Sequence, residues 1–223
     1  MASVTRPRPT TSPPATPFKT LGEVIKQLGG ISADRVRMSP VPGTATERDL
    51  IRHNDREDPI CELIDGVLVE KVMGQEESRL AALLIFFLVT FVKPGNLGAV
   101  FAPDGPMRLS PNQVRLPDVA FVRRERLRGL KNSKEAILGL SPDLAIEVLS
   151  KSNSRGEMER KLRDYFAAGC RLVWYVDPRK RAVRVYTSPV QVITFGEGET
   201  LDGGEVLPGF TLPLRDLFAE LDA

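Results

Sequence analysis

The sequence predicts an α/β fold in which helices cover both sides of central β-strands. Short apolar segments of strand length alternate with longer segments whose apolar residues recur at helical spacing. The strand-like segments around Asp118 and Glu147 have apolar residues on both strand faces, which is typical of central strands. Two turn sequences, Asp65-Gly66 and Asp177-Pro178-Arg179-Lys180, predict additional β-hairpins beside this core.

Length and composition predict one domain with a sizeable core. The chain has 223 residues, of which 42% are hydrophobic. Residues 1–17 contain five prolines among serines and threonines, so we expect a disordered tail followed by a single domain over 18–223. With 31 basic and 29 acidic side chains, affinity for nucleic acid would have to come from local clusters of charge.

Cysteine usage and hydropathy predict a soluble protein of the cytoplasm without a membrane partner. Cys61 and Cys170 are the two cysteines, which argues against a disulfide framework and against a thiolate zinc cluster. The first residues lack the apolar core of a secretory signal. The longest apolar run, Leu80 to Val92, is shorter than the ~20 residues of a membrane span.

The sequence pattern in the first half of the domain predicts a helix, a β-hairpin and a second helix. Apolar residues at helical spacing predict a helix over 20–28, which Gly29-Gly30 would end. Strands over 60–64 and 67–72 flank the Asp65-Gly66 turn. A long helix is predicted over 76–92, ending at Lys93-Pro94-Gly95.

The sequence pattern in the second half predicts several strands and one further long helix. Strands are expected near 99–102, 114–122 and 143–149, and a polar loop then leads into a helix over 157–168 that ends at Gly169. A second hairpin is expected from strands 172–176 and 182–186. From Val190 onward the pattern indicates short strands and a last helical turn at 214–221.

Two acids inside apolar strands are the strongest indication of function. Packing gives no reason for Asp118 or Glu147, and an ionised carboxylate in a protein interior costs several kcal/mol unless it is paired or binds a metal. Mg²⁺ takes oxygen ligands, typically with one or two protein carboxylates. The pair therefore suggests a Mg²⁺ (or Mn²⁺) site, and the alternative is that both acids are structural and pair with arginine.

Three further residues are candidates to complete such a site. Lys161 borders the buried face of the helix over 157–168, from which its ammonium could stabilise charge in a phosphoryl transition state. A snorkelling surface lysine is the alternative. Glu62 and Glu77 could support the metal through bound waters. Glu77 extends the buried stripe of its helix, but the helix dipole also favours an acid there.

Clusters of basic residues are candidates for contact with nucleic acid. The connection after the strand of Asp118 would contact a phosphate backbone if it lay beside the metal centre, and a solvated loop is the alternative. Its candidate residues are Arg123, Arg124, Arg126 and Arg128. Arg179-Lys180-Arg181, at a hairpin turn, is a weaker candidate, and the lone histidine, His53, is expected to face solvent.

The motifs together resemble a known family. The chain has no G-x-S-x-G elbow, phosphate-binding Walker loop or dinucleotide fingerprint. From about residue 18 to the C-terminus it resembles the Uma-type putative restriction endonuclease family of the PD-(D/E)XK nuclease superfamily. The resemblance is carried by these segments in this order: Glu62-Leu63-Ile64-Asp65-Gly66, Arg115 to Phe121, Glu147-Val148-Leu149-Ser150, Lys161 with Tyr165, and Trp174 to Pro178.

The resemblance implies a restriction-endonuclease-like core, a mixed sheet flanked by helices, and hydrolysis of DNA phosphodiester bonds with a divalent metal. Asp118, Glu147 and the backbone carbonyl of Val148 would be the metal ligands. The lysine that usually stands two residues after the second acid is replaced by Leu149, and Lys161 matches a family in which the lysine has moved to the next helix. At Glu77, where many relatives carry histidine, a carboxylate changes the local charge.

Two other kinds of function remain open from the sequence. A nucleic-acid-binding or assembly module could keep this fold without catalysis. A homodimer could use Phe86, Phe87 and Phe91 as its interface, although these residues are also expected in the core.

Overall fold

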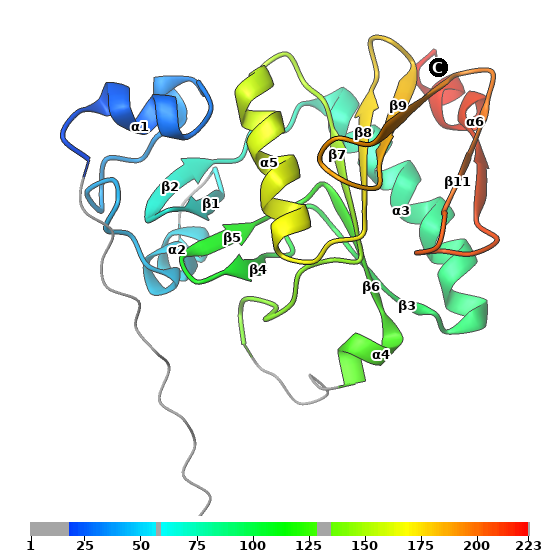
Figure 1. Cartoon of the computed structure of the whole chain (residues 1–223), viewed down its shortest axis with the longest axis horizontal. Helices are drawn as coiled ribbons and strands as arrows, with labels where there is room; N and C mark the ends of the chain where they lie inside the picture. The colour runs from blue at the N-terminus through cyan, green and yellow to red at the C-terminus, as the bar shows by residue number, and fades with distance from the viewer. Residues whose placement is uncertain (1–17, 57–58, 129–134, 223) are drawn as a thin grey trace, which may run out of the picture.

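A six-stranded mixed sheet lies at the centre of the structure, in the order β10-β9-β8-β7-β6-β3 (Figure 1). The structure is a computed structural model that describes residues 18–56, 59–128 and 135–222; the predicted tail over 1–17 lies outside these residues. Only β7 and β8 are parallel among the six, and α5 connects them. The strands are β3 (Gly98–Phe101), β6 (Val119–Arg123), β7 (Leu144–Val148), β8 (Leu172–Asp177), β9 (Ala182–Tyr186) and β10 (Val192–Gly196).

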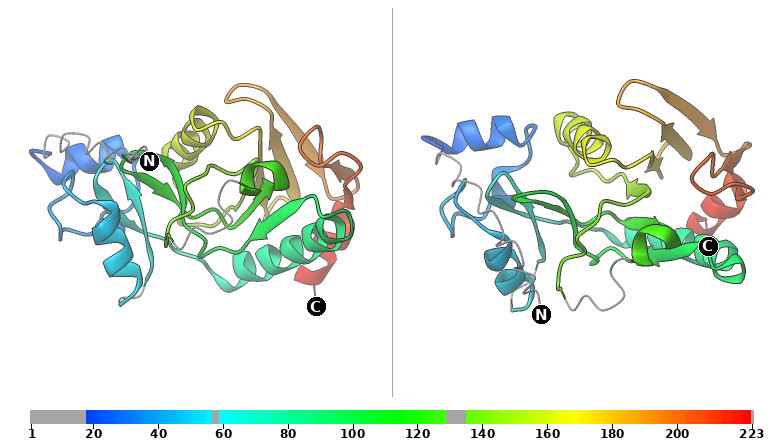
Figure 2. Two further views of the ribbon diagram at one scale, coloured as in Figure 1. Left: turned by 90° about the horizontal axis from the view of Figure 1, so that it is seen from below. Right: turned by 60° about the horizontal axis from the view of Figure 1, so that its bottom comes forward.

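Helices cover both faces of this sheet, as the strand patterns predicted. The largest apolar core lies between α3 (Gln75–Gly95), α6 (Leu214–Phe218) and one face, where side chains such as Ile146 and Trp174 meet α3. On the opposite face α5 (Arg155–Ala167) packs on Val173 and Tyr175 (Figure 2). Successive strand residues thus point into different cores, which explains why β7 and β8 are apolar throughout.

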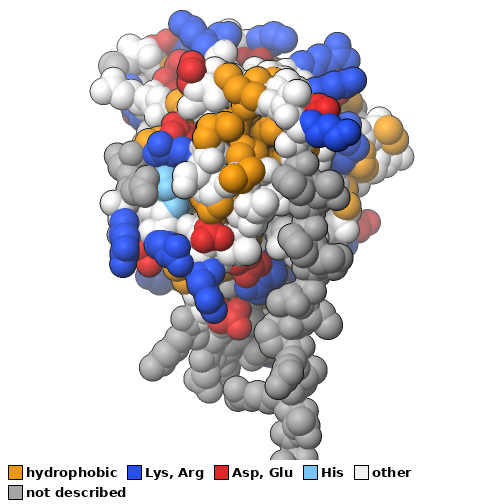
Figure 3. Space-filling view, turned by 90° about the vertical axis from the view of Figure 1, so that its left-hand side faces the viewer, with side chains coloured by type: hydrophobic (Ala, Val, Ile, Leu, Met, Phe, Trp, Pro, Cys, Tyr) orange, Lys and Arg blue, Asp and Glu red, His pale blue; other side chains and the backbone are white. Residues whose placement is uncertain are grey.

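A second, four-stranded sheet in the order β2-β1-β5-β4 stands beside the first. The predicted hairpin over Asp65-Gly66 is confirmed, because both turn residues have positive φ, 49° and 73°, and Ile64 pairs with Val67. Figure 3 looks onto the side that carries α1 and α2, where apolar side chains gather among Lys and Arg. The elements are α1 (Leu21–Gln27), η1 (Ala33–Arg35), α2 (Glu47–Asn54), β1 (Cys61–Ile64), β2 (Val67–Glu70), β4 (Met107–Ser110) and β5 (Gln113–Arg115).

The strand predicted over 114–122 is in fact two strands in two different sheets. β5 pairs with β1 and β4 in the four-stranded sheet, and β6 pairs with β3 and β7 in the six-stranded sheet. Leu116, Pro117 and Asp118 form the connection between them. Proline has no N–H to donate to a ladder, so the chain leaves one sheet at Pro117 and enters the other directly after Asp118.

The long helix and the end of the chain differ slightly from expectation. α3 ends at Gly95, so the predicted stop at Lys93-Pro94-Gly95 is confirmed, but the helix includes Pro94 and its C-cap is Asn96, with a left-handed φ of 49°. The predicted β8–β9 hairpin is confirmed. The chain then ends with β11 (Thr200–Asp202), β12 (Thr211–Pro213), α6 and η3 (Ala219–Leu221).

By length and composition alone, α3 could cross a membrane, with a mean hydropathy of 1.6 over its most apolar window. In this fold, however, Leu80, Leu84 and Leu88 are fully buried in the main core. Phe86 on the outer side of the helix is 62% exposed, so the expectation that it belongs to the core is wrong, whereas Phe87 and Phe91 pack against the core.

The β1–β2 turn provides a test of the fold, because two glycines with similar φ differ in their surroundings. A Cβ on Gly66 (φ 73°) would lie 2.6 Å from the carbonyl oxygen of Gly43, while a Cβ on Gly30 (φ 77°) would meet nothing within 4 Å. Gly30→Ala should cost about 1 kcal/mol of unfolding free energy. Gly66→Ala should cost about 1–3 kcal/mol more, because backbone must also move. Equal costs in urea unfolding would contradict this packing.

Candidate active site

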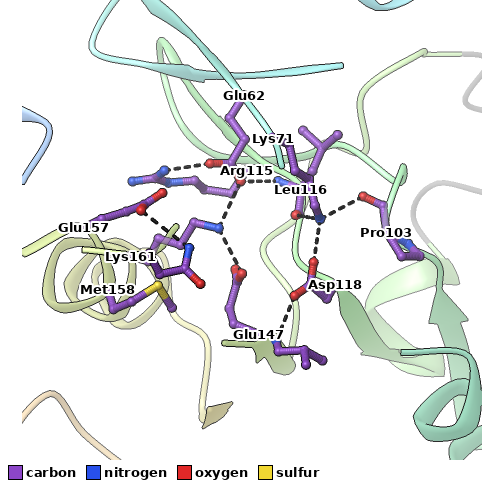
Figure 4. Close-up of polar contacts among 12 residues, drawn as sticks. Glu62, Lys71, Pro103, Arg115, Leu116, Asp118, Glu147, Glu157, Met158 and Lys161 are labelled. Atoms are coloured by element: carbon purple, nitrogen blue, oxygen red, sulfur yellow. Dashed lines mark hydrogen bonds and ion pairs between the residues drawn. The ribbon is translucent and has the colours of Figure 1, made fainter. Parts of the chain in front are cut away.

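A cluster of buried charged side chains lies where the two sheets meet α5 (Figure 4). Glu62 comes from β1, Asp118 from the connection that precedes β6, Glu147 from β7 and Lys161 from α5. These four residues are only 2% to 6% exposed. The structure therefore brings together four of the five residues predicted to do chemistry.

Asp118 stands beside Glu147 at the same edge of the six-stranded sheet. β6 and β7 are antiparallel, and Val119 pairs with Ile146. Asp118, directly before Val119, therefore lies opposite Glu147, directly after Ile146. One carboxylate oxygen of Asp118, Oδ2, accepts a hydrogen bond of 2.7 Å from the backbone N–H of Val148. Because the N–H and C=O of a strand residue point to the same side, the Val148 carbonyl also faces the Asp118 side of β7.

The other oxygen of Asp118 is bound by Lys71, which directly follows β2. The Lys71 Nζ lies 2.9 Å from Asp118 Oδ1 and also donates to the carbonyl oxygens of Leu116, at 2.5 Å, and Pro103, at 3.1 Å. Three oxygen acceptors thus surround this ammonium (Figure 4). Lys71 also lines a pocket of about 320 Å³ together with Met73, so this side of the cluster borders a cavity.

Glu147 is bound by two side chains of α5. Its Oε2 accepts from Lys161 Nζ at 2.9 Å, and its Oε1 accepts from the Tyr165 hydroxyl at 2.5 Å. Lys161 and Tyr165 are one helical turn apart on α5, so both reach the same carboxylate. The Lys161 ammonium also lies 3.5 Å from Glu62 and so connects the two sheets.

Glu62 is held by Arg115 and by the backbone of the sheet connection. Its Oε2 accepts from Arg115 at 2.8 Å, and its Oε1 accepts from the N–H of Leu116 at 3.0 Å. Arg115 also binds Asp164 of α5 at 2.5 Å. Arg115 is 1% exposed, so it needs both acids to balance its buried charge.

The two glutamates around Lys161 differ in acidity. Burial would raise the pKa of Glu62, but Lys161 and Arg115 outweigh it and lower this pKa to about 2. For Glu147, burial and the neighbouring Asp118 raise the pKa above the ordinary carboxyl value, although Lys161 opposes the shift. Burial would lower the pKa of Lys161, but Glu147 and Glu62 raise it, so the lysine stays charged.

The oxygens at this sheet edge fit a hard divalent cation. Asp118 and Glu147 at adjacent strand ends, with the Val148 carbonyl on the Asp118 side of β7, supply the ligand types that Mg²⁺ prefers, and Mg²⁺ commonly takes only one or two carboxylates. Among the described residues, no group of three or more His, Cys, Asp or Glu side chains is arranged to hold a metal ion. Lysine ammoniums instead neutralise the acids, so a cation ligated by Asp118 would exchange with Lys71.

Two of the predicted groups lie away from the cluster. Glu77 is half-exposed in the first turn of α3, and no hydrogen bond or ion pair joins it to Asp118 or Glu147 within the described residues. The basic connection was a candidate for contact with a phosphate backbone if it lay beside Asp118 and Glu147, and its described part does not lie there. It forms α4 (Arg124–Leu127) at the far end of β6, roughly 20 Å from Asp118 at about 3.3 Å per residue.

Within this basic connection, two of the four arginines have structural partners. Arg123 donates to the backbone carbonyls of Glu205 and Val206. Arg126 forms an ion pair of 3.2 Å with the buried Asp143. Arg124 is half-buried and Arg128 is exposed.

Sequence reasoning missed Lys71 and Arg115 as parts of the cluster. Lys71 lies one residue beyond β2 and looks like an ordinary charged strand end, and Arg115 sits in an apolar strand that could have drawn notice as Asp118 did. His53 was expected to face solvent, but it is 7% exposed and its Nε2 lies 3.1 Å from the carbonyl oxygen of Pro59.

Comparison with known proteins places this arrangement in a family. A family model described as Uma2, putative restriction endonuclease, matches residues 47–215. A search of curated proteins found no match. Among solved structures, the chain is similar to a putative nuclease belonging to DUF820 from Anabaena variabilis, with a TM-score of 0.66 and 22% identity over 74% of this chain and 92% of that one. At this identity the likeness shows the fold, a mixed sheet flanked by helices.

The charge balance of the cluster predicts how Glu62 affects stability. Glu62→Gln should lower the unfolding free energy by about 3 kcal/mol near neutral pH, because it leaves the buried Arg115 and Lys161 without their shared acid. The exposed pair of Arg155 and Glu159 is the control, and Glu159→Gln should cost less than about 1 kcal/mol.

The same variant should also change the pH dependence of stability. The folded pKa of Glu62, about 2, lies below its ordinary value of 4.5, so the unfolded chain binds the extra proton. The contribution of Glu62 is therefore complete above about pH 5 and is lost as the pH falls toward 2. Chemical unfolding at pH 6 and pH 3 should give a smaller difference between wild type and Glu62→Gln at pH 3. A constant difference would contradict this assignment.

Proposed function

Because the chain belongs to the Uma2 family of putative restriction endonucleases, we propose that it is a divalent-metal-dependent endonuclease that hydrolyses phosphodiester bonds of DNA. The observation that carries this proposal is the pair of buried carboxylates, Asp118 and Glu147, on neighbouring strands with the Lys161 ammonium beside them. Adjacent carboxylates repel each other, and burial together with Asp118 raises the pKa of Glu147, so stability alone does not favour placing these two acids side by side. Phosphoryl chemistry needs oxygen ligands and a cation together.

In this proposal Asp118, Glu147 and the Val148 carbonyl hold Mg²⁺ or Mn²⁺. The bound ion would polarise the phosphate and lower the pKa of a water molecule. Lys161, whose pKa is raised by Glu147 and Glu62, carries a fixed positive charge next to Glu147, where it can stabilise negative charge that develops on the phosphate. Tyr165 holds the second oxygen of Glu147 and so fixes the orientation of this carboxylate.

Glu62 acts through Lys161 in this proposal and is a positioning residue. It lies 3.5 Å from the lysine ammonium and is itself fixed by Arg115 and the Leu116 N–H. The resulting chain of contacts sets the position of Lys161 between two carboxylates. Glu77, half-exposed on α3, has no role in this arrangement.

The proposal is tested by incubating the purified protein with single-stranded DNA, duplex DNA and RNA in Mg²⁺ or Mn²⁺. Asp118→Asn and Glu147→Gln should each reduce cleavage at least ~100-fold, because each removes a charge from the metal site. The control is Glu125→Gln on the exposed surface of α4, which should leave the rate unchanged. Cleavage that persists in both site variants would identify a contaminating nuclease. Binding of nucleic acid without any binding of divalent ions would favour a non-catalytic module instead.

The ion pair between Lys71 and Asp118 predicts that a substitution of Lys71 changes the affinity for the metal ion. In Lys71→Met, Asp118 Oδ1 loses the ammonium that lies 2.9 Å away, so Mn²⁺ should bind about tenfold more tightly in calorimetry while the metal-free protein becomes less stable. Lys71→Arg keeps a positive charge and should bind Mn²⁺ much as wild type does. If Lys71→Met binds no more tightly than Lys71→Arg, the lysine does not compete with the ion.

A further inference from the structure

A concave groove of about 570 Å³ lies on the side of α5 that faces β9, away from the carboxylates. The loop that follows β7, the first turns of α5 and the β8–β9 turn form its walls. Its volume falls within the range of small-molecule and nucleotide sites. None of the proposed metal ligands lines it, so it is separate from the cluster around Lys161.

The pairing of the strands places two residues of this groove, Tyr175 and Arg184, in one cross-strand row with Glu147. Glu147 pairs with Tyr175 across β7 and β8, and Tyr175 pairs with Arg184 across β8 and β9. Paired residues point to the same face of a sheet, so these three side chains all lie on the α5 face. With neighbouring strands about 4.8 Å apart, the backbone at Arg184 is roughly 10 Å from that at Glu147.

Three positive side chains in the groove have no counter-ion among the described residues. Arg179 and Lys180 are exposed at the β8–β9 turn, and Arg184 is half-buried. The lining acids are bound to other groups, because Glu159 pairs with Arg155 at 2.7 Å and Asp177 accepts from the Lys180 backbone N–H, so neither forms an ion pair with these three cations. The groove therefore presents positive charge that the fold does not use.

An aromatic support fixes Arg184 in this position. Its guanidinium lies over the Tyr175 ring, 5.6 Å from the centroid. The Tyr175 hydroxyl donates to the carbonyl oxygen of Met158 at 2.7 Å, and Tyr186 packs edge-on against the Tyr175 ring. A buried ring held on both sides restricts the arginine before any ligand arrives, which lowers the entropy lost on binding.

The remaining lining of the groove combines the polar Ser150, Asn153 and Ser154 with an apolar and aromatic wall. Leu149, Leu162, Tyr186 and Pro189 contribute surface against which a base can pack. Proteins that bind single strands combine a positively charged groove with such surface, because the bases of a single strand are exposed. A paired duplex keeps the faces of its bases stacked inside, so they are not available to pack against such a wall.

We propose that this groove binds a single-stranded segment of nucleic acid, with its phosphates on Arg179, Lys180 and Arg184 and a base against the apolar wall. This inference rests on the proposed function only in taking the bound strand to be the one that continues to the proposed nuclease site at Glu147. Glu147 and the β8–β9 turn lie at the same edge of the sheet, because β7 and β8 are parallel. At about 3.4 Å per nucleotide, the roughly 10 Å separation corresponds to about three nucleotides from the scissile phosphate.

The test measures binding without cleavage. Fluorescence anisotropy with a labelled oligothymidylate in EDTA compares wild type with the triple variant Arg179→Gln, Lys180→Gln, Arg184→Gln. The variant should bind at least ~10-fold more weakly, and its slope of log affinity against log salt should be smaller by about two, at roughly 0.7 per phosphate contact. The matched control removes three exposed charges elsewhere, through Arg48→Gln, Lys93→Gln and Arg163→Gln, and should stay within about twofold of wild type.

The outcomes separate this proposal from the proposed nuclease. Equal weakening in the groove variant and the control would overturn the groove, because general charge would then explain binding. Equal affinity of wild type for a duplex of the same length would overturn the preference for single strands. If the groove variant alone loses binding while no metal supports cleavage, the groove stands and the nuclease proposal fails. Circular dichroism of each variant shows whether it is folded before binding is compared.

Discussion

The structure depends on balancing buried charge where two sheets meet. Asp118, Glu62 and Glu147 lie at this junction, and three cations, Lys71, Arg115 and Lys161, match them one for one. Each buried ion without a partner would cost several kcal/mol. Arg115 and Glu62 pair within one sheet, but Lys71 joins Asp118 from beside β2, and Lys161 binds both Glu62 and Glu147, so these cations are satisfied only when the two sheets and α5 assemble together. The charges therefore specify how the sheets dock as well as where chemistry can occur.

The connection at Leu116, Pro117 and Asp118 makes this docking possible. Pro117 ends pairing in one sheet, so the polar groups of its two neighbours are available to bind side chains and backbone of the cluster. The Leu116 N–H donates to Glu62, and the Leu116 carbonyl accepts from Lys71. The Asp118 carboxylate accepts from the Val148 N–H. A continuous strand could not do this, because its polar backbone groups would be consumed by a single ladder. The break at Pro117 thus places Asp118 where its carboxylate binds Lys71, which follows β2 of one sheet, and Val148 in the other.

Much of the fold could be predicted from the sequence because its patterns are local. Asp65-Gly66 fixes a two-residue hairpin, and the apolar residues on both faces of β7 require cover on both sides. Asp118, Glu147, Lys161 and Glu62 could be singled out because charge in apolar surroundings needs a reason. Lys71 could not be interpreted this way, since its partners come from segments distant in sequence, as in its contact with Pro103.

Strand direction explains why the expected and observed basic surfaces differ. The arginines at the end of β6 follow Asp118 within a few residues in sequence, but the extended strand carries the chain away from Asp118 to the opposite edge of the sheet. Arg184 is 37 positions after Glu147 in sequence, yet two strand spacings separate them in the sheet. Because β7 and β8 are parallel and a tight turn leads into β9, the residues of that turn return to the edge where Glu147 lies. In such a sheet, the cations that lie at the same edge and on the same face as a buried acid come from neighbouring strands rather than from its own.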